Sequence, residues 1–282
     1  MEKGAPHLER FVTLVTLLVF QQIMDVTNLQ KRVIIAFRGT QDVSDVISDV
    51  SCSPGQLEGV ECGHAHWGFA QVANRIDVDA IIALAADNDV VLTGHSMGGA
   101  VALLVALRVL ARLEATGRSA ASIWDDFREK GHTMPSSEAC MHFGVVTLGS
   151  PPPLCLALAQ RNLGNKRFVL NVVDVSDRVP FLFSSVPCLP GLVCAHSTHP
   201  LTLADSHTRI VGQEDEDRFA FHGLLYVLDS KEHPWPVCDD DGWRALCSSA
   251  KTFAAHACSG YFCALELLSE ERTLSLTYCT VQ

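Results

Sequence analysis

The stretch that decides the fold is Val-Val-Leu-Thr-Gly-His-Ser-Met-Gly-Gly-Ala, residues 90–100. Its first four residues form a short apolar strand, and an unbroken apolar helix is predicted to follow from 100 to 114. Between them, Gly94 to Gly98 fits the pattern Gly-x-Ser-x-Gly, in which the serine sits on a sharp strand-to-helix turn and side chains at the flanking positions would clash. The pattern predicts that Ser96 is a nucleophile. The N-terminus of the helix that follows carries a partial positive charge, which favours an oxyanion. The alternative is a glycine-rich structural turn.

Strands and helices alternate on both sides of this stretch, which predicts an α/β fold with a mostly parallel central sheet and flanking helices. A polar turn at 25–31 separates two β-rich runs, 11–24 and 32–38, and predicts an N-terminal β-hairpin. The other expected elements are strands at 143–149 and 168–173 and helices at 69–86, 154–163 and 217–229.

Composition excludes several classes of protein. The chain has 282 residues, of which 48% are hydrophobic and 19% charged, so it can bury a sizeable core and is neither disordered nor collagen-like. The net charge is −11, from 32 acidic against 21 basic residues. Nucleic acid and anionic membrane surfaces would repel that charge, so we expect no nucleic-acid partner and no coulombic membrane docking.

The apolar run Phe11–Phe20 is too short to span a membrane, since ten residues compare with the roughly 20 that a spanning helix needs. It also lacks the basic start and the cleavage site of a signal peptide. We therefore expect a buried strand there, no transmembrane segment, and a cytoplasmic location in preference to secretion.

The eleven cysteines are ambiguous because an odd number cannot all pair within one chain. Cys52 with Cys62, and Cys188 with Cys194, flank loops and could each form a disulfide. Free buried thiols are the preferred interpretation. No Cys/His cluster has the spacing of a zinc site, so neither a metal nor a cofactor is expected.

A serine nucleophile needs a base and an orienting acid, which follow it in the order Ser, Asp or Glu, His in such folds. Asp174 and Asp177 both lie just beyond the strand predicted at 168–173, at its carboxyl end. Spacing alone does not choose among the downstream histidines, which are His196, His199, His207, His222, His233 and His256.

Six ordered motifs within residues 11–229 resemble the class 3, or fungal-type, lipases. They are Phe37-Arg38-Gly39-Thr40, Asp49-Val50, His66-Trp67-Gly68-Phe69, Thr93–Ala100, Thr147–Pro151 and Asp177-Arg178-Val179-Pro180. The resemblance implies an α/β-hydrolase fold and a serine hydrolase that cleaves carboxylic esters of lipids, of the acylglycerol type, through an acyl-enzyme. The alternatives are an esterase acting on soluble or cell-wall esters and an inactive, lipid-binding homologue.

The resemblance also implies roles for single residues. Ser96 matches the family nucleophile, and Asp177 matches the family acid in preference to Asp174. The family base is a histidine shortly before an aromatic residue, which His222 fits best through Tyr226. Thr40 and Met97 match the oxyanion-hole positions. His66 and His95 are expected to fix local structure.

Two segments leave questions open. Residues 41–50 carry an apolar stripe at helical spacing, which indicates either a lid that turns toward lipid or an ordinary surface helix. Contact with a lipid–water interface would have to be apolar and to use this segment. The sequence departs from the family at its short start and at residues 230–282, a cysteine-rich end interpreted as an appendage to the hydrolase domain of 11–229.

Overall fold

The structure is a computed structural model of the whole chain. It describes twelve segments, with gaps between them: 26–29, 32–39, 54–61, 64–86, 88–123, 140–155, 158–159, 162–180, 219–229, 232–237, 256–257 and 259–261. The predicted strand 11–24, the possible lid 41–50, Thr40 and the four cysteines of the possible disulfides lie outside these segments. Cys140 and Cys155, which lie inside them, are free thiols.

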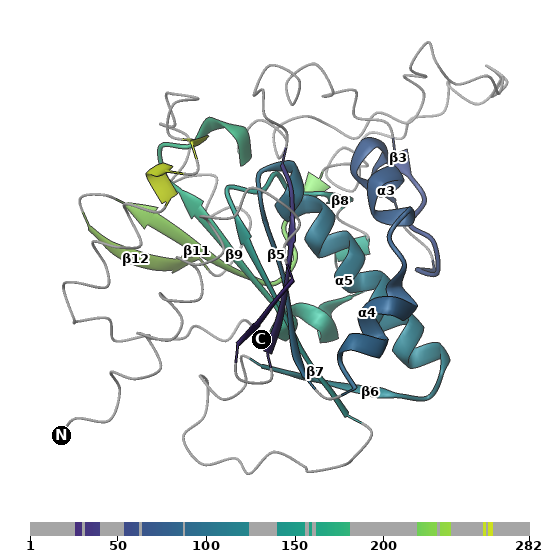
Figure 1. Cartoon of the computed structure of the whole chain (residues 1–282). Coiled ribbons are helices and arrows are strands. Elements are labelled where there is room, and N and C mark those ends of the chain that lie inside the picture. The colour runs from purple at the N-terminus through teal and green to yellow at the C-terminus, as the bar shows by residue number, and fades with distance from the viewer. Residues whose placement is uncertain are drawn as a thin grey trace, which may run out of the picture.

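A mostly parallel sheet runs through the centre of the molecule (Figure 1). Its strand order is β1-β2-β5-β7-β9-β11-β12, with β6 paired to β7. Five neighbouring strands of this order, β2, β5, β7, β9 and β11, run parallel to one another. The edge strands β1 and β12 are antiparallel to their neighbours. The bounds are Val26–Leu29, Arg32–Phe37, Asp89–His95, Cys140–Leu148, Val169–Asp174, Leu224–Asp229 and Glu232–Val237, and β6 is Ser119–Ser122. This confirms the predicted α/β-hydrolase architecture.

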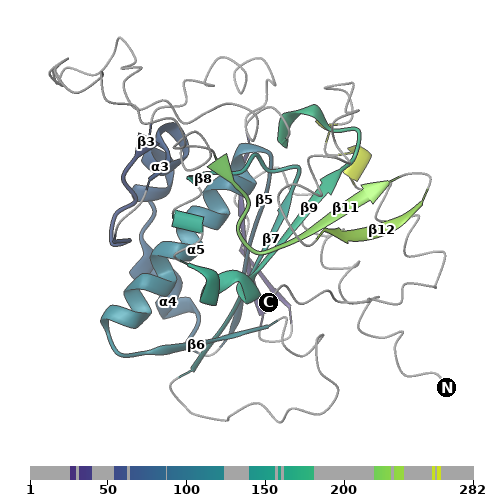
Figure 2. The ribbon, with the colours of Figure 1, turned by 180° about the vertical axis from the view of Figure 1, so that it is seen from behind.

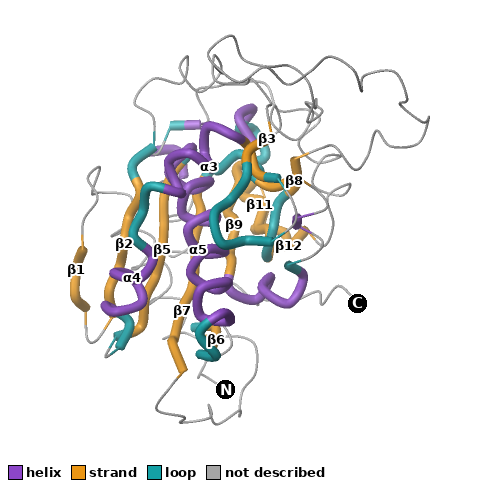
Figure 3. The backbone as a smooth tube through the Cα atoms, turned by 90° about the vertical axis from the view of Figure 1, so that its right-hand side faces the viewer, coloured by secondary structure: helices purple, strands orange, loops and turns teal. Residues whose placement is uncertain are grey.

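Three helices cover one face of the sheet, and Figure 3 shows them lying in front of the strands. They are α3 (Trp67–Asn74), α4 (Val78–Leu84) and α5 (Met97–Ala115). A four-stranded antiparallel sheet of short strands lies beside α3 (Figure 2), in the order β10-β8-β4-β3. Its strands are Phe219–Ala220, Leu154–Cys155, Ala65–His66 and Pro54–Gly55. The short helix η1 (Leu163–Phe168) leads into β9.

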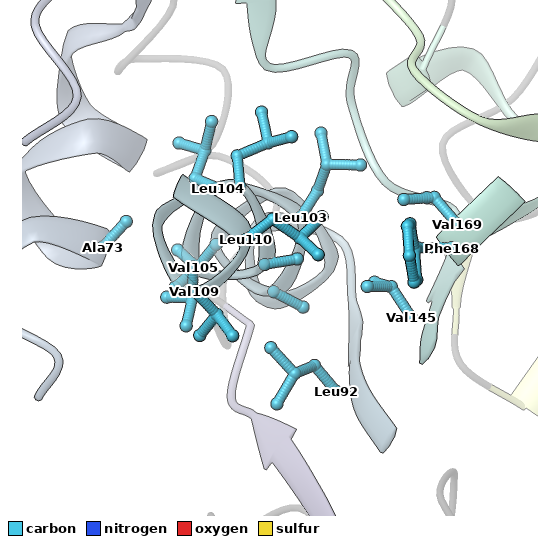
Figure 4. Packing of buried hydrophobic residues seen from close by; sticks show 14 of the residues in the cluster. Ala73, Leu92, Leu103, Leu104, Val105, Val109, Leu110, Val145, Phe168 and Val169 are labelled. Atoms are coloured by element: carbon cyan, nitrogen blue, oxygen red, sulfur yellow. The ribbon is translucent and has the colours of Figure 1, made fainter. Parts of the chain in front are cut away.

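The core forms where α5 packs on the sheet (Figure 4). Leu103, Leu104 and Val105 on the helix are buried in the same hydrophobic cluster as the strand residues Leu92 and Val145. Strands that are covered on both faces read as continuous apolar runs, which explains why β5 contains Val-Val-Leu at 90–92. The buried helix α5 therefore follows directly after the buried strand β5.

Three predicted elements differ from the structure. The single helix expected at 69–86 is two helices, because Asp77 caps a new one by accepting a hydrogen bond from the Ala80 N–H at 3.1 Å. The helix expected at 154–163 begins as β8. The helix expected at 217–229 is instead β10 and β11, separated by Gly223 at a φ of 105°, which no helix tolerates.

The predicted N-terminal hairpin is not confirmed. Its first strand, 11–24, lies outside the described segments, and its turn, 25–31, contains β1. A different antiparallel pair, β1 with β2, occupies this edge of the sheet.

The described part of residues 230–282 is joined to the central sheet. β12 pairs with β11, with Leu225 opposite Val237, and Tyr261 is fully buried. Within the described residues, the region after 230 therefore adds a strand to the central sheet and a side chain to the buried interior. Among the helices within the described segments, none has the length and hydropathy to span a bilayer.

Candidate active site

Ser96 lies on the turn between β5 and α5 and has φ 55° and ψ −130°. Among the described residues other than glycine, it alone has a positive φ. Such a conformation costs on the order of 1–3 kcal/mol and persists only where neighbouring structure enforces it. Here the Ser96 N–H donates to the Leu148 carbonyl at 2.9 Å, and the Ser96 carbonyl accepts from the Gly99 N–H at 3.0 Å. The turn is therefore held by both β7 and α5.

The glycines around Ser96 are required by close backbone contacts. A Cβ at Gly94 would collide with the backbone of Gly98, and one at Gly98 would collide with the Phe37 carbonyl oxygen. A Cβ at Gly39 would lie 2.5 Å from the His95 carbonyl oxygen. The chain that leaves β2 therefore runs directly against the serine turn. The clashes at Gly94 and Gly98 are of the kind that the Gly-x-Ser-x-Gly pattern predicts.

Asp177 follows β9 and is completely buried. Its Oδ1 accepts a hydrogen bond from the Val179 N–H at 2.9 Å. Its Oδ2 lies 2.8 Å from His256 Nδ1 and accepts from the Tyr261 hydroxyl at 2.6 Å. A buried carboxylate needs such partners, because an unpaired charge in a protein interior is costly. The side chain is aimed at His256.

His256 connects Asp177 to Ser96. Its Nε2 lies 2.7 Å from Ser96 Oγ, and the two residues are 160 positions apart in the sequence. With Nδ1 as the protonated nitrogen, the ring donates to Asp177 and accepts from the serine hydroxyl. Ser96 and His256 are each only 2% exposed. The three side chains thus form one buried hydrogen-bonded chain.

The structure does not place His222 in this chain, which corrects the sequence-based choice of base. His222 precedes Gly223 in the turn between β10 and β11, where its Nδ1 lies 3.3 Å from the Ala159 carbonyl oxygen. Burial is the main cause that lowers the pKa of His222 to about 4, so the ring is neutral at pH 7. The Asn171 amide holds the turn by donating to the His222 carbonyl at 2.8 Å.

Asp174 also stays outside the chain, as expected. Its Oδ1 accepts hydrogen bonds from the Ser176 N–H at 2.8 Å and from the Ser176 hydroxyl. These bonds close a turn within two residues, which is the local role that aspartate often takes at a strand end.

His95 and His66 contact aromatic rings. The ring of His95 lies 4.7 Å from that of His256, and burial, followed by repulsion from His256, lowers the pKa of His95 to about 4. His66 is stacked on Phe69 with 4.2 Å between centroids and lies 5.5 Å from Phe219. Both histidines therefore pack against rings from distant segments, and the expectation that they fix local structure stays a prediction.

Sequence reasoning included His256 among six candidate histidines without choosing it, and it did not single out Tyr261. His256 precedes Tyr261 by five residues, so it also fits the pattern of a histidine shortly before an aromatic residue. The resemblance favours His222 because Tyr226 follows it closely, and this local pattern does not distinguish the two histidines. Among the described residues, no group of His, Cys, Asp and Glu could hold a metal ion.

The fold and the chain of Ser96, His256 and Asp177 define an α/β-hydrolase with a serine-centred site. The family model of lipase (class 3) matches residues 34–186. This protein belongs to the class 3 lipase family.

Known relatives cover the chain to different extents. Mouse diacylglycerol lipase-beta is 36% identical over 89 residues, which are 28% of this chain and 13% of that protein. The triacylglyceride lipase of Rhizomucor miehei superposes with a TM-score of 0.53 and 18% identity, over 89% of this chain and 91% of its own. A triacylglycerol lipase whose catalytic centre is a serine protease triad superposes with a TM-score of 0.53 and 20% identity, over 80% of this chain and 70% of its own. The structural likenesses establish the fold.

Proposed function

We propose that this protein is a serine hydrolase that cleaves carboxylic esters of lipids, of the acylglycerol type, through an acyl-enzyme. The observation that carries the proposal is the hydrogen-bonded chain from Ser96 through His256 to Asp177, centred on a serine in a strained strand-to-helix turn. A serine hydroxyl is a weak nucleophile until an adjacent base takes its proton, and this chain supplies that base.

Each side chain has a distinct role in the proposed reaction. Ser96 Oγ attacks the ester carbonyl carbon while His256 Nε2 takes the hydroxyl proton. Asp177 stabilises the imidazolium and does not itself take up the proton. The ester C–O bond then breaks, and His256 gives the proton to the leaving alcohol. Water, deprotonated by His256, hydrolyses the acyl-enzyme and releases the acid and free Ser96.

The oxyanion of the tetrahedral intermediates needs donors beside Ser96, and Thr40 and Met97 are the proposed pair. Met97 is the first residue of α5, so its N–H belongs to the helix end whose partial positive charge favours an anion. Gly39, the residue before Thr40, lies against the serine turn. Loss of one such donor costs about 3 kcal/mol of transition-state stabilisation in comparable sites.

Family membership and the mouse relative favour a lipid ester as the substrate. We propose that the protein binds its ester substrate at a lipid–water interface, which the apolar stripe of residues 41–50 would contact. Esters of soluble or cell-wall compounds would use the same three side chains, so chain-length preference separates the two substrate classes.

The test is hydrolysis of glycerol esters and p-nitrophenyl esters over a range of acyl lengths. We expect turnover of long-chain acylglycerols and its loss in Ser96→Ala, by on the order of 10⁴-fold or more. A sharp cut-off at short acyl chains would contradict a lipid substrate. Absence of turnover with every ester would favour an inactive, lipid-binding protein.

A further inference from the structure

We propose that Tyr261 is a positioning residue for the acid of this site, and that its hydroxyl fixes the Asp177 carboxylate on which His256 depends. The proposal rests on the proposed function of Ser96, His256 and Asp177. Residues 256–261 would then have two roles, because they include both the proposed base, His256, and Tyr261, which hydrogen-bonds the proposed acid.

The hydrogen bonds of Tyr261 leave one direction for its proton. The Asp174 backbone N–H, which can only donate, donates to the Tyr261 oxygen at 3.0 Å. The hydroxyl proton is therefore directed to Asp177 Oδ2 at 2.6 Å. A short hydrogen bond to a buried carboxylate is of the strong, charge-assisted kind. Burial, followed by the nearby Asp177 charge, raises the pKa of Tyr261 well above its usual range, so the donor proton is retained.

The Tyr261 ring is held as closely as its hydroxyl. The side chain is completely buried, and its ring lies edge-on to that of His95 at 5.8 Å. Gly149, just beyond β7, has a φ of 54°, and a Cβ there would lie 2.9 Å from three Tyr261 atoms. The ring therefore occupies a slot that exists because residue 149 has no side chain.

The geometry has a direct consequence for catalysis, because Tyr261 and His256 share the same carboxylate oxygen. The tyrosine sets the orientation of Asp177 and takes up part of its negative charge. Without that donor, the carboxylate would stabilise the His256 imidazolium more strongly but hold it less accurately. The other described titratable groups around this cluster are Asp174 and His95.

Tyr261→Phe removes the hydroxyl and keeps the ring. We expect kcat/KM to fall about tenfold, mainly through kcat, since one hydrogen bond to a charged group is lost. The acid limb of the pH profile of kcat/KM should move to higher pH. In the free protein, the low-field proton resonance of His256 Nδ1–H, identified by its absence in His256→Ala, should shift. Loss of activity with neither shift would assign Tyr261 to packing alone and overturn the proposal, as would a variant identical to wild type.

Gly149→Ala tests the position of the Tyr261 ring without changing the tyrosine itself. The added methyl group would push the Tyr261 ring away, and a similar loss of kcat/KM and a similar resonance shift are expected. Gly117→Ala is the matched control, because Gly117 has a comparable φ of 68° and nothing within 4 Å of the added Cβ. Both variants carry the cost of alanine at positive φ, so equal activities and spectra in the two would contradict the proposal.

Failure of the proposed function would be distinguishable from failure of this inference. A wild-type protein that hydrolyses no ester would contradict the assigned reaction, whereas the resonance of His256 still reports whether Tyr261 sets the hydrogen bond to Asp177. Hydrolysis by wild type, together with an unchanged resonance and pH profile in Tyr261→Phe, would overturn the role of Tyr261 and leave the reaction standing.

Discussion

His222 and His256 are both candidates for the base, and their surroundings in the structure differ. His256 bridges Ser96 and Asp177, with both ring nitrogens in use, whereas His222 lies against the Ala159 carbonyl. Short-range sequence patterns fit both residues. The choice depends on bringing together positions 160 residues apart, and no local pattern carries that information. Ser96 was predictable because its strand, glycines and helix are contiguous.

Substitution of each histidine gives opposite expectations. His256→Ala should lower kcat/KM on the order of 10⁴–10⁶-fold, the range seen when a serine hydrolase loses its base. His222→Gln, which keeps a donor for the Ala159 carbonyl, should stay within a few fold of wild type. Steady-state kinetics on one ester decides the matter, and a larger loss in the His222 variant would restore the sequence-based assignment.

The buried histidines also predict how stability depends on pH. The pKa values of His95 and His222 are lowered from 6.5 to about 4, so between these values the unfolded chain binds more protons than the folded one. The free energy of unfolding should therefore fall as the pH drops from about 6.5 to about 4. When the free energy of unfolding is measured by urea denaturation at several pH values across this window, it should change less steeply with pH for His222→Gln than for wild type. Equal slopes would mean that His222 is not buried as a neutral ring.

At the scale of elements, the predictions succeeded where periodicity and turn residues agreed. The strand at 90–93 and the helix after it are confirmed as β5 and α5, because an apolar run, a glycine turn and an uninterrupted helix leave few alternatives. Residues 217–229 were predicted as a helix from an apolar run that suits a buried strand equally well. Pairing of β11 with β9 decides between them, and that pairing is non-local.

Helix α5 carries a buried Arg108 that ties it to α3. Its guanidinium donates to the carbonyls of Ala73 and Ile76 and pairs with Glu58 at 3.2 Å. Arg108→Met would remove the guanidinium that donates to these two carbonyls and pairs with Glu58, so the free energy of unfolding should fall by about 2–4 kcal/mol. Thermal or urea denaturation measures this change.

The control for Arg108 is Arg112 on the same helix. Arg112 forms an exposed pair with Asp79 at 2.8 Å, and exposed pairs contribute little to stability. Arg112→Met should therefore unfold close to wild type. An equal loss in both variants would show that the buried hydrogen bonds of Arg108 have no special importance.

At the scale of the whole molecule, the site is built from segments far apart in the sequence. The proposed nucleophile comes from the turn after β5, the proposed acid from the turn after β9, and the proposed base and Tyr261 from beyond β12. The sequence predicts the places of the first two because such folds gather active residues at the carboxyl ends of parallel strands. His256 and Tyr261 lie in the cysteine-rich segment, whose composition suggested no role.

The central claim is that Ser96, activated by His256, is the nucleophile. The most direct measurement is reaction with a fluorophosphonate probe followed by peptide mapping of the adduct. We expect one covalent adduct on Ser96 in wild type, greatly slowed labelling in His256→Ala, and rapid labelling in His222→Gln. An adduct on another serine, or labelling of the His256→Ala variant at the wild-type rate, would contradict the account.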